Sequence, residues 1–202
     1  MKNHILKSIS YIFHPLIMPL LGVVFYFSKT PRFIPDIIIK AKLFSVFILT
    51  IILPILMYFL LKTIKKIDSI HLKSTQERVV PLAVNIFIIA LIITRIFPHN
   101  EVIELYYFFV GILCSTIACL FLAFLKVKAS IHMLAACGFF MFIVALSVHF
   151  KINVNGTLAI MMIILGAIAT SRLHLEAHTN AELVIGSFIG LFPQLILLKF
   201  WL

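Results

Sequence analysis

Charged side chains are scarce in this sequence, and acidic ones are the scarcest: 12% of the 202 residues are charged, and only seven are Asp or Glu. Soluble domains carry roughly a quarter of their residues as charged side chains, so this shortage excludes an ordinary soluble globular protein. Apolar residues take their place, at 63% of the chain. The composition therefore predicts an integral membrane protein.

The alternation of apolar and polar residues that is typical of a membrane β-barrel is absent too. Several apolar runs instead reach or approach the roughly 20 residues that a helix needs to cross about 30 Å of hydrocarbon. We expect an all-α fold, a polytopic transmembrane helix bundle of about six to seven spans, with residues 1–202 in a single membrane domain. The predicted spans are 10–28, 41–62, 79–97, 104–125, 131–149, 156–171 and 182–201.

Cysteine is rare, and the three cysteines lie inside predicted spans, where a free thiol behaves as a small hydrophobe. They carry no information about the redox compartment. Lys2 and Lys7 precede the first apolar run, as in a signal peptide, but no small-x-small cleavage pattern follows it. We interpret the run as a retained first span.

The net charge is +10, and the basic residues form short clusters between the spans. This distribution favours membrane lipids with anionic head groups as partners, rather than nucleic acid. If the helices alternate in direction, the segments 63–78, 126–132 and 172–181 all emerge on the face that carries the N-terminus. Three polar segments are therefore expected to meet there.

The third of these segments leads into the motif SRLHLEAHTNAELVIG, Ser171 to Gly186. On a helix, His178, Glu182, Gly186 and Gly190 form one stripe, because they recur every fourth residue. The carboxylate can orient the imidazole, and the two glycines allow another helix to approach closely. An alternative for Glu182 is a capping box with Thr179, of the form S/T-x-x-E.

The other two segments are KKIDSIHLKSTQERVVPL, which holds Lys73 and Arg78, and LKVKASIHML, which holds Lys128, Ser130 and His132. Each has a plainer interpretation. The first can be a basic interfacial helix, and the second a pair of snorkelling lysines with a histidine at the membrane edge.

Together, the three segments bring cations, a hydroxyl and two imidazoles to one face. Cations and hydroxyls match the oxygens of a phosphate, arginine by bidentate geometry, while histidine supplies a nucleophile or a proton donor. We therefore expect a phosphate site. The residues expected to bind phosphate are Lys73, Arg78, Lys128, Ser130 and Arg172.

These residues resemble the motifs of the type 2 phosphatidic acid phosphatase superfamily, which includes lipid phosphatases and vanadium haloperoxidases. Its motifs are K-x6-R-P, P-S-G-H and S-R-x5-H-x3-D. The third matches from Ser171 to Glu182, with glutamate in place of aspartate. The second keeps the serine and histidine of Ala129-Ser130-Ile131-His132. The first keeps Arg78, with the proline delayed to Pro81 and His71 at the lysine position.

The resemblance implies a mechanism and a set of roles. His178 would attack phosphorus to form a phosphohistidine, Glu182 would hold its ring, and His132 would protonate the leaving oxygen. No cofactor or metal is implied. The substrate would be a phospholipid or polyprenyl phosphate, for example phosphatidic acid, phosphatidylglycerol phosphate, a polyprenyl diphosphate or a lipid A phosphate, and the sequence does not rank them.

Three alternatives stay open. A non-catalytic transporter or lipid binder would use the same cations to hold an anionic head group, and a metal hydrolase would use His174, His178, Glu182 and His132 as ligands. A phosphotransferase would pass the phosphoryl group to an acceptor other than water. The sequence does not indicate an oligomeric state.

The distribution of Lys and Arg only weakly indicates the orientation of the chain in the membrane. Ten Lys and Arg fall on the face of the three segments and seven on the other, but removing the four proposed site cations, Lys73, Arg78, Lys128 and Arg172, leaves six against seven. The resemblance implies a bacterial inner membrane protein whose site lies on the extracytoplasmic side.

Overall fold

The computed structural model describes residues 2–65 and 74–202, and in this part of the chain the fold is the expected all-α bundle. Within the described residues, six helical segments are long and apolar enough to cross a membrane, so the chain is an integral membrane protein. The helices are α1 (Lys2–Ile12), α2 (Met18–Lys29), α3 (Asp36–Phe47), α4 (Leu53–Thr63), α5 (Thr75–Leu91), α6 (Ile103–Phe124), α7 (Ile131–Phe150), α8 (Asn155–His174) and α9 (Asn180–Leu197).

Two of the spans are continued by π-helical turns, and the last ends in a 3₁₀ turn. Ile48–Ile52 joins α3 to α4 as one span, Ile92–Ile96 extends α5, and Leu198–Phe200 follows α9.

The predicted first span, 10–28, is wrong as a single helix. It divides into α1 and the shorter apolar helix α2, and the chain turns between them at His14 and Pro15. The proline ring disfavours helical backbone at the residue before it and has no N–H to donate, so α1 cannot continue through it. Pro19 is accommodated, because it lies in the first turn of α2, where its missing N–H would have no helical partner.

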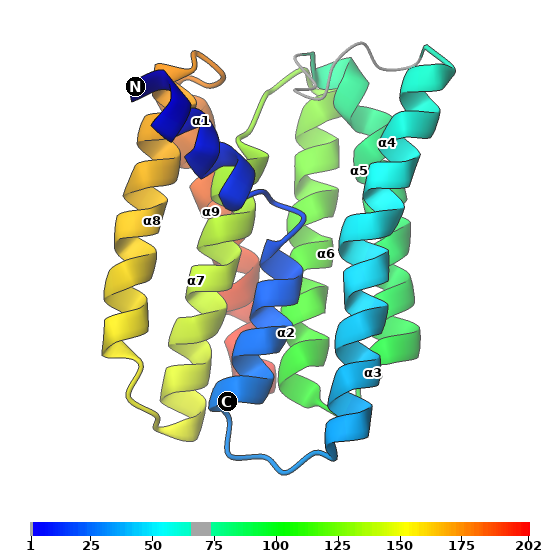
Figure 1. Ribbon diagram of the computed structural model, residues 1–202, viewed down its shortest axis with the longest axis vertical. Helices are drawn as coiled ribbons and strands as arrows, with labels where there is room; N and C mark the ends of the chain where they lie inside the picture. The colour runs from blue at the N-terminus through cyan, green and yellow to red at the C-terminus, as the bar shows by residue number, and fades with distance from the viewer. Residues whose placement is uncertain (1, 66–73) are drawn as a thin grey trace.

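The remaining spans alternate in direction, as Figure 1 shows. One end of the bundle, which we call the N-terminal face, carries α1, the C-terminal end of α4 and the N-terminal end of α5. It also carries the α6–α7 and α8–α9 connections. The C-terminus lies toward the opposite end. α7 is central, packing against α2, α6, α8 and α9, while α1 lies against α8.

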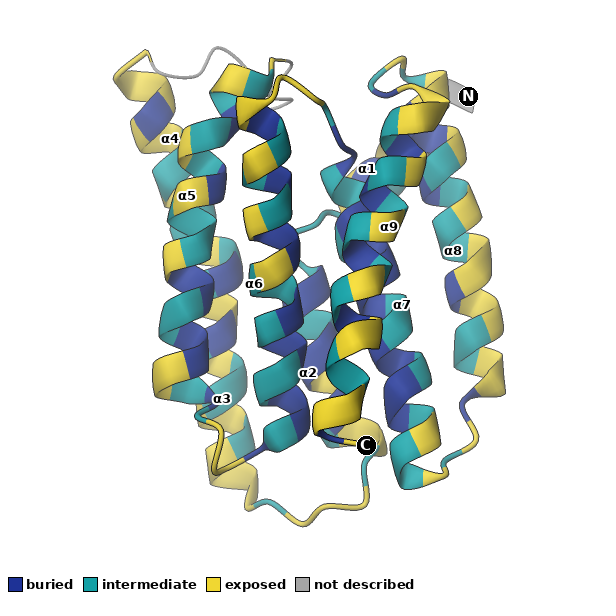
Figure 2. Cartoon of the chain, turned by 180° about the vertical axis from the view of Figure 1, so that it is seen from behind, coloured by how far each residue is buried: buried dark blue, intermediate teal, exposed yellow. Residues whose placement is uncertain are grey.

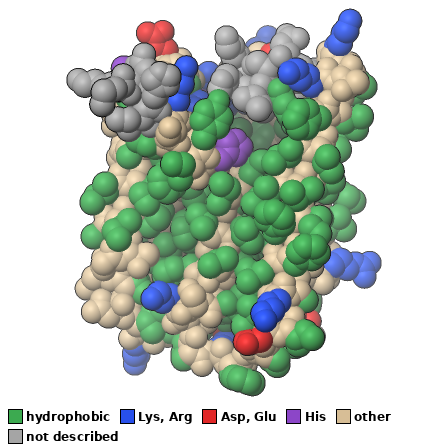
Figure 3. Space-filling model, viewed as in Figure 1, with side chains coloured by type: hydrophobic (Ala, Val, Ile, Leu, Met, Phe, Trp, Pro, Cys, Tyr) green, Lys and Arg blue, Asp and Glu red, His purple; other side chains and the backbone are tan. Residues whose placement is uncertain are grey.

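The interior of the bundle and its outer surface are both largely apolar. Buried residues face inward between the helices in Figure 2, and Phe108 and Phe142 stack there with ring centroids 4.2 Å apart. Large apolar side chains such as Ile163 and Phe87 are exposed on the outside. Figure 3 shows hydrophobic side chains over the middle of the molecule and most Lys and Arg toward its ends, the distribution expected of a surface that faces lipid.

The glycines of α9 allow it to lie directly against the start of α7, as the sequence predicts. A Cβ on Gly186 would lie 2.5 Å from the backbone oxygen of Ser130, and a Cβ on Gly190 would overlap the carbonyl of Leu134. Because no side chain separates the two backbones, the beginnings of α7 and α9 meet on the N-terminal face. This contact brings together two of the three polar segments.

Candidate functional site

The closest polar contact of the site joins His178 to Glu182. His178 lies two residues before α9, rather than on it, while Thr179 is the N-cap and accepts the backbone N–H of Glu182 at 3.3 Å. The helical side chain of Glu182 points back toward the N-terminus, and its Oε2 lies 2.6 Å from Nδ1 of His178. Thr179 thus caps α9, as the capping-box interpretation expects, and the carboxylate of Glu182 pairs with the imidazole of His178.

This contact determines which ring nitrogen of His178 is available. A carboxylate accepts hydrogen bonds, so Nδ1 carries the proton and the neutral ring keeps its lone pair on Nε2. The carboxylate also fixes the orientation of the ring.

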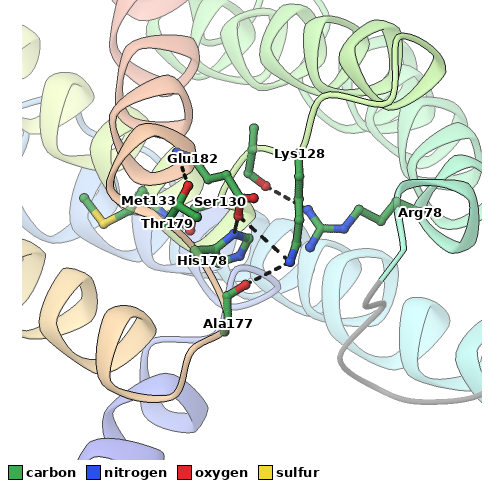
Figure 4. Close-up of polar contacts among 9 residues, drawn as sticks. Arg78, Lys128, Ser130, Met133, Ala177, His178, Thr179 and Glu182 are labelled. Carbon is green, nitrogen blue, oxygen red and sulfur yellow. Dashed lines mark hydrogen bonds and ion pairs between the residues drawn. The ribbon is translucent and has the colours of Figure 1, made fainter.

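Ser130 starts α7 and ties this segment to α9. Its hydroxyl accepts the N–H of Met133 at 3.4 Å as the N-cap, and its own N–H donates to the carbonyl of Glu182 at 3.0 Å. The Ser130 side chain is fully buried by these contacts. Figure 4 shows it beside His178 and Glu182.

Two cations connect the segments. Arg78, on α5, donates through Nη1 to the carbonyl of Ala129 at 2.8 Å, although Arg78 is only 5% exposed. Lys128 donates to the carbonyl of Ala177 at 2.9 Å, and its Nζ lies 3.9 Å from Oε2 of Glu182. In Figure 4, Arg78 reaches in from one side and His178 from the other, with Lys128 between them.

The two connections that carry these groups have the same backbone turn. Lys126 and Glu176 adopt left-handed conformations, with φ of 60° and 50°, directly after the C-caps of α6 and α8. In each, the next residue donates back across the last helical turn, as Ala177 does to the carbonyl of Arg172. Such positions are usually glycine, so both turns store strain of about 1 kcal/mol or more beside the site.

Arg172, in the last turn of α8, is also buried. Its Nη1 donates to the hydroxyl of Ser10 at 3.4 Å, and its Nε is buried without a hydrogen-bond partner in the described part of the chain. His132 lies near it in the first turn of α7, and its Nε2 donates to the carbonyl of Ser10 at 3.2 Å.

These side chains line one cavity of about 1100 Å³, to which Arg78, Lys128, His132, Arg172 and His178 all contribute. Residues as far apart in the sequence as Arg78 and His178 therefore line the same cavity. This agrees with the prediction that the three polar segments meet on one face of the bundle. Figure 3 shows a recess in the apolar surface near the N-terminal face, in which a histidine is visible.

The rest of the cavity wall is largely apolar and extends into the bundle. Along α5 its lining runs from Arg78 to Ile88, about 15 Å of helix at 1.5 Å per residue. Leu82, Phe108 and Phe139 also line it. The cavity thus has a cationic end at the N-terminal face and an apolar part that reaches into the hydrocarbon region.

Of the predicted site residues in the described part of the chain, two do not line this cavity. Ser130 is used as a helix cap and is not among the lining residues. Glu182 lines a smaller adjoining cavity, which shares Lys128, Ala177 and His178 with the first. Lys73, like His71, lies outside the described residues.

Burial and the nearby cations together lower the pKa of the His178 imidazole to about 4. Burial is the largest cause, the hydrogen bond to Glu182 opposes it, and the charges of Arg78, Lys128 and Arg172 add to it. Burial likewise lowers the pKa of the Lys128 amine, and the nearby carboxylate of Glu182 opposes that shift. At neutral pH the site therefore holds a neutral imidazole among cations.

The metal-hydrolase alternative needs several ligands around one point. Within residues 2–65 and 74–202, no three His, Cys, Asp or Glu side chains are grouped to hold a metal ion. His174, one of its expected ligands, is exposed and is not a lining residue of the cavity.

One wall of the cavity was not predicted from the sequence; the N-terminal residues Lys7, Ser10, Tyr11 and His14 provide it. Ser10 and His14 are four residues apart within an apolar run, and polar side chains in such runs usually have a function. That spacing was the available signal.

No family model matches this chain, and no curated protein or solved structure is significantly similar to it. An assignment of function therefore depends on the motif residues and on the geometry of the cavity.

Proposed function

We propose that this protein is a membrane-embedded, metal-independent phosphatase that hydrolyses a lipid phosphate or diphosphate through a phosphohistidine intermediate. The resemblance of its motifs to the type 2 phosphatidic acid phosphatase superfamily supports this assignment. The observation that carries it is a neutral imidazole, with its Nε2 lone pair free of Glu182, on the wall of a cavity that also holds Arg78, Lys128 and Arg172.

In the first step, Nε2 of His178 attacks phosphorus, and the bond from phosphorus to the lipid oxygen breaks. His132 enters this step as the imidazolium and gives one ring proton to the leaving oxygen, so that it becomes the neutral imidazole. Glu182 stabilises the positive charge that forms on the His178 ring.

In the second step, water attacks the phosphohistidine. The N–P bond breaks and inorganic phosphate leaves, while His132 accepts a proton from the water. In both steps the negative charge on the phosphoryl oxygens is stabilised by fixed cations, which need no reorganisation during the reaction.

Glutamate in place of the family's aspartate is compatible with this role. The added methylene is accommodated because His178 precedes the helix, and the carboxylate lies 2.6 Å from Nδ1. The apolar part of the cavity supports an amphiphilic substrate over a soluble phosphate ester, because it offers space for a hydrocarbon chain beside the cations.

The test is phosphate release by the purified protein from a panel of lipid phosphates and diphosphates. His178→Ala should reduce release by at least about 10³-fold, because it removes the nucleophile. His99→Ala, on the opposite face, is the matched control and should retain activity. A chelator should have no effect; loss of activity with chelator would favour the metal hydrolase.

If the unmodified protein releases no phosphate from any lipid of the panel, the assignment is wrong. The second candidate is then a transporter or binder of anionic lipid head groups, which the same buried cations favour. A binder would retain affinity for the head group and show no turnover for His178→Ala to remove.

A further inference from the structure

The N-terminal elbow, residues 10–15, connects two helices that pack on different sides of the cavity. α1 lies against α8, which carries Arg172, and α2 lies against α7, which carries His132. The elbow therefore crosses between two of the polar segments (Figure 1). Ser10 and His14, the polar residues of the elbow other than Tyr11, both line the cavity.

Ser10 makes polar contacts to both segments. Ser171 Oγ donates to the carbonyl of Leu6 at 2.6 Å, which uses its only proton, so Ser10 Oγ must donate to Ser171 Oγ at 2.7 Å. The Ser10 hydroxyl is then left to accept from Arg172 at 3.4 Å. The chain of donors thus runs from the guanidinium through two buried hydroxyls to a helix carbonyl and orients Arg172.

The backbone of Ser10 orients the second segment as well. Its carbonyl accepts from Nε2 of His132, so Nε2 carries a proton in both the neutral and the charged ring. Ser10 therefore holds both the guanidinium proposed to bind the phosphoryl oxygens and the imidazole proposed to protonate the leaving group.

His14 presents a donor to the same cavity. The N–H of Leu16 points at Nδ1 of His14 at 3.4 Å, so in the neutral ring the proton lies on Nε2. The ring is edge-on to His132, with centroids 5.5 Å apart. Burial lowers the pKa of His14, and the charge of Arg172 lowers it further, so this donor is uncharged at neutral pH.

We propose that the N-terminal elbow is a fourth segment of the phosphate site, in which Ser10 positions Arg172 and His132 and His14 donates a hydrogen bond from Nε2 to the bound phosphoryl group. This inference rests on the proposed function for the identity of the ligand. It adds two residues that lie outside all three sequence motifs.

The experiment measures inorganic phosphate binding by calorimetry, and phosphate release from the lipid panel, with the full chain in detergent. His14→Phe keeps a ring against His132 and removes the donor; His14→Gln restores an N–H donor. We expect His14→Phe to weaken phosphate binding by about tenfold or more, as for one hydrogen bond to a charged group. His14→Gln should recover most of that loss, and His99→Phe is the matched control.

For the positioning role, Ser10→Ala removes the hydroxyl, and Ser10→Thr retains it. Ser10→Ala should lower kcat by about tenfold or more with a smaller change in KM, because a misplaced guanidinium loses more in the transition state than in substrate binding. Ser10→Thr should recover kcat. Ser28→Ala, an exposed serine at the far end of α2, is the control.

The outcomes separate this inference from the function on which it rests. If the unmodified protein hydrolyses a lipid phosphate and the Ser10 and His14 variants match their controls, the elbow is only a wall and the inference is wrong. If no lipid is hydrolysed but His14→Phe still weakens phosphate binding and His14→Gln restores it, the inference stands and the phosphatase assignment falls. Absence of phosphate binding together with absence of lipid hydrolysis by the unmodified protein would overturn both.

Discussion

At the scale of single residues, His178 is subject to opposing effects. Desolvation and three nearby cations favour the neutral ring, whereas the hydrogen bond to Glu182 favours the protonated ring. The first effects dominate, so the ring is a neutral nucleophile at rest. The carboxylate becomes most valuable once phosphoryl transfer has placed a positive charge on the ring.

The titration of His178 tests this balance. In the unmodified protein the imidazole should protonate well below its usual pKa of 6.5, toward the value of about 4. Glu182→Gln should lower the pKa of His178 further, because it removes an interaction that favours the charged ring. Arg78→Gln should raise it, because it removes a repulsive charge. The measurement is the pH dependence of the ¹⁵N imidazole signals in detergent micelles.

The His99 signal, from the opposite end of the molecule, is the internal control and should be the same in all three proteins. A His178 ring that titrates at its ordinary value, or that becomes more basic in Glu182→Gln, would contradict this description of the site.

The roles of individual residues were unequally accessible from sequence. Glu182 and His178 could be paired because four-residue spacing places side chains together on or beside a helix. The partners of Ser10 are 161 and 162 residues away, and no local pattern encodes such a contact. The prediction for Ser130 shows a further limit of sequence patterns. Its hydroxyl was expected to bind phosphate, but in the structure it accepts the backbone N–H of Met133 as a helix cap.

At the scale of helices, the apolar runs predict the spans well, because lipid demands a continuous apolar stretch about 30 Å long and all backbone hydrogen bonds made within it. The predicted run 131–149 corresponds to α7, Ile131–Phe150. The first span fails because hydropathy does not register the backbone restriction at Pro15. This break in the helix forms the N-terminal elbow. The segment that was predicted wrongly is therefore one that lines the cavity of the candidate site.

Packing between α7 and α9 gives a prediction at this scale. Gly190→Ala should lower the free energy of unfolding by about 1–3 kcal/mol, because the new methyl group overlaps the Leu134 carbonyl and must separate the two helices. Gly166→Ala, on α8, is the matched control, since nothing lies within 4 Å of its Cβ position. It should leave stability unchanged or raise it by up to about 1 kcal/mol.

Unfolding in detergent can be followed by the fluorescence of Trp201, the single tryptophan. Gly190→Ala should also weaken phosphate binding, because the same helix contact holds the Ser130 N–H on the Glu182 carbonyl. Equal stability of the two glycine variants would show that the helices can separate without cost, contrary to this packing.

At the scale of the whole molecule, the cationic site obscures the charge signal for orientation. Lysines and arginines near membrane boundaries usually mark the cytoplasmic face. Here, three cations on the N-terminal face, Arg78, Lys128 and Arg172, point into a cavity instead of toward lipid head groups. Their positions reflect the candidate site and not the orientation of the chain in the membrane. The sequence therefore predicts the fold more securely than it predicts which side of the membrane the site faces.

Orientation can be measured in a cysteine-free background, with Cys114, Cys119 and Cys137 replaced and one new cysteine on each face. Asn180 is exposed beside the site, and Asn100 is exposed on the opposite face. If the site is extracytoplasmic, an impermeant maleimide should label Asn180→Cys in intact cells and label Asn100→Cys only after permeabilisation. The reverse pattern would place the site in the cytoplasm, where its substrate would have to be a lipid phosphate of the inner leaflet.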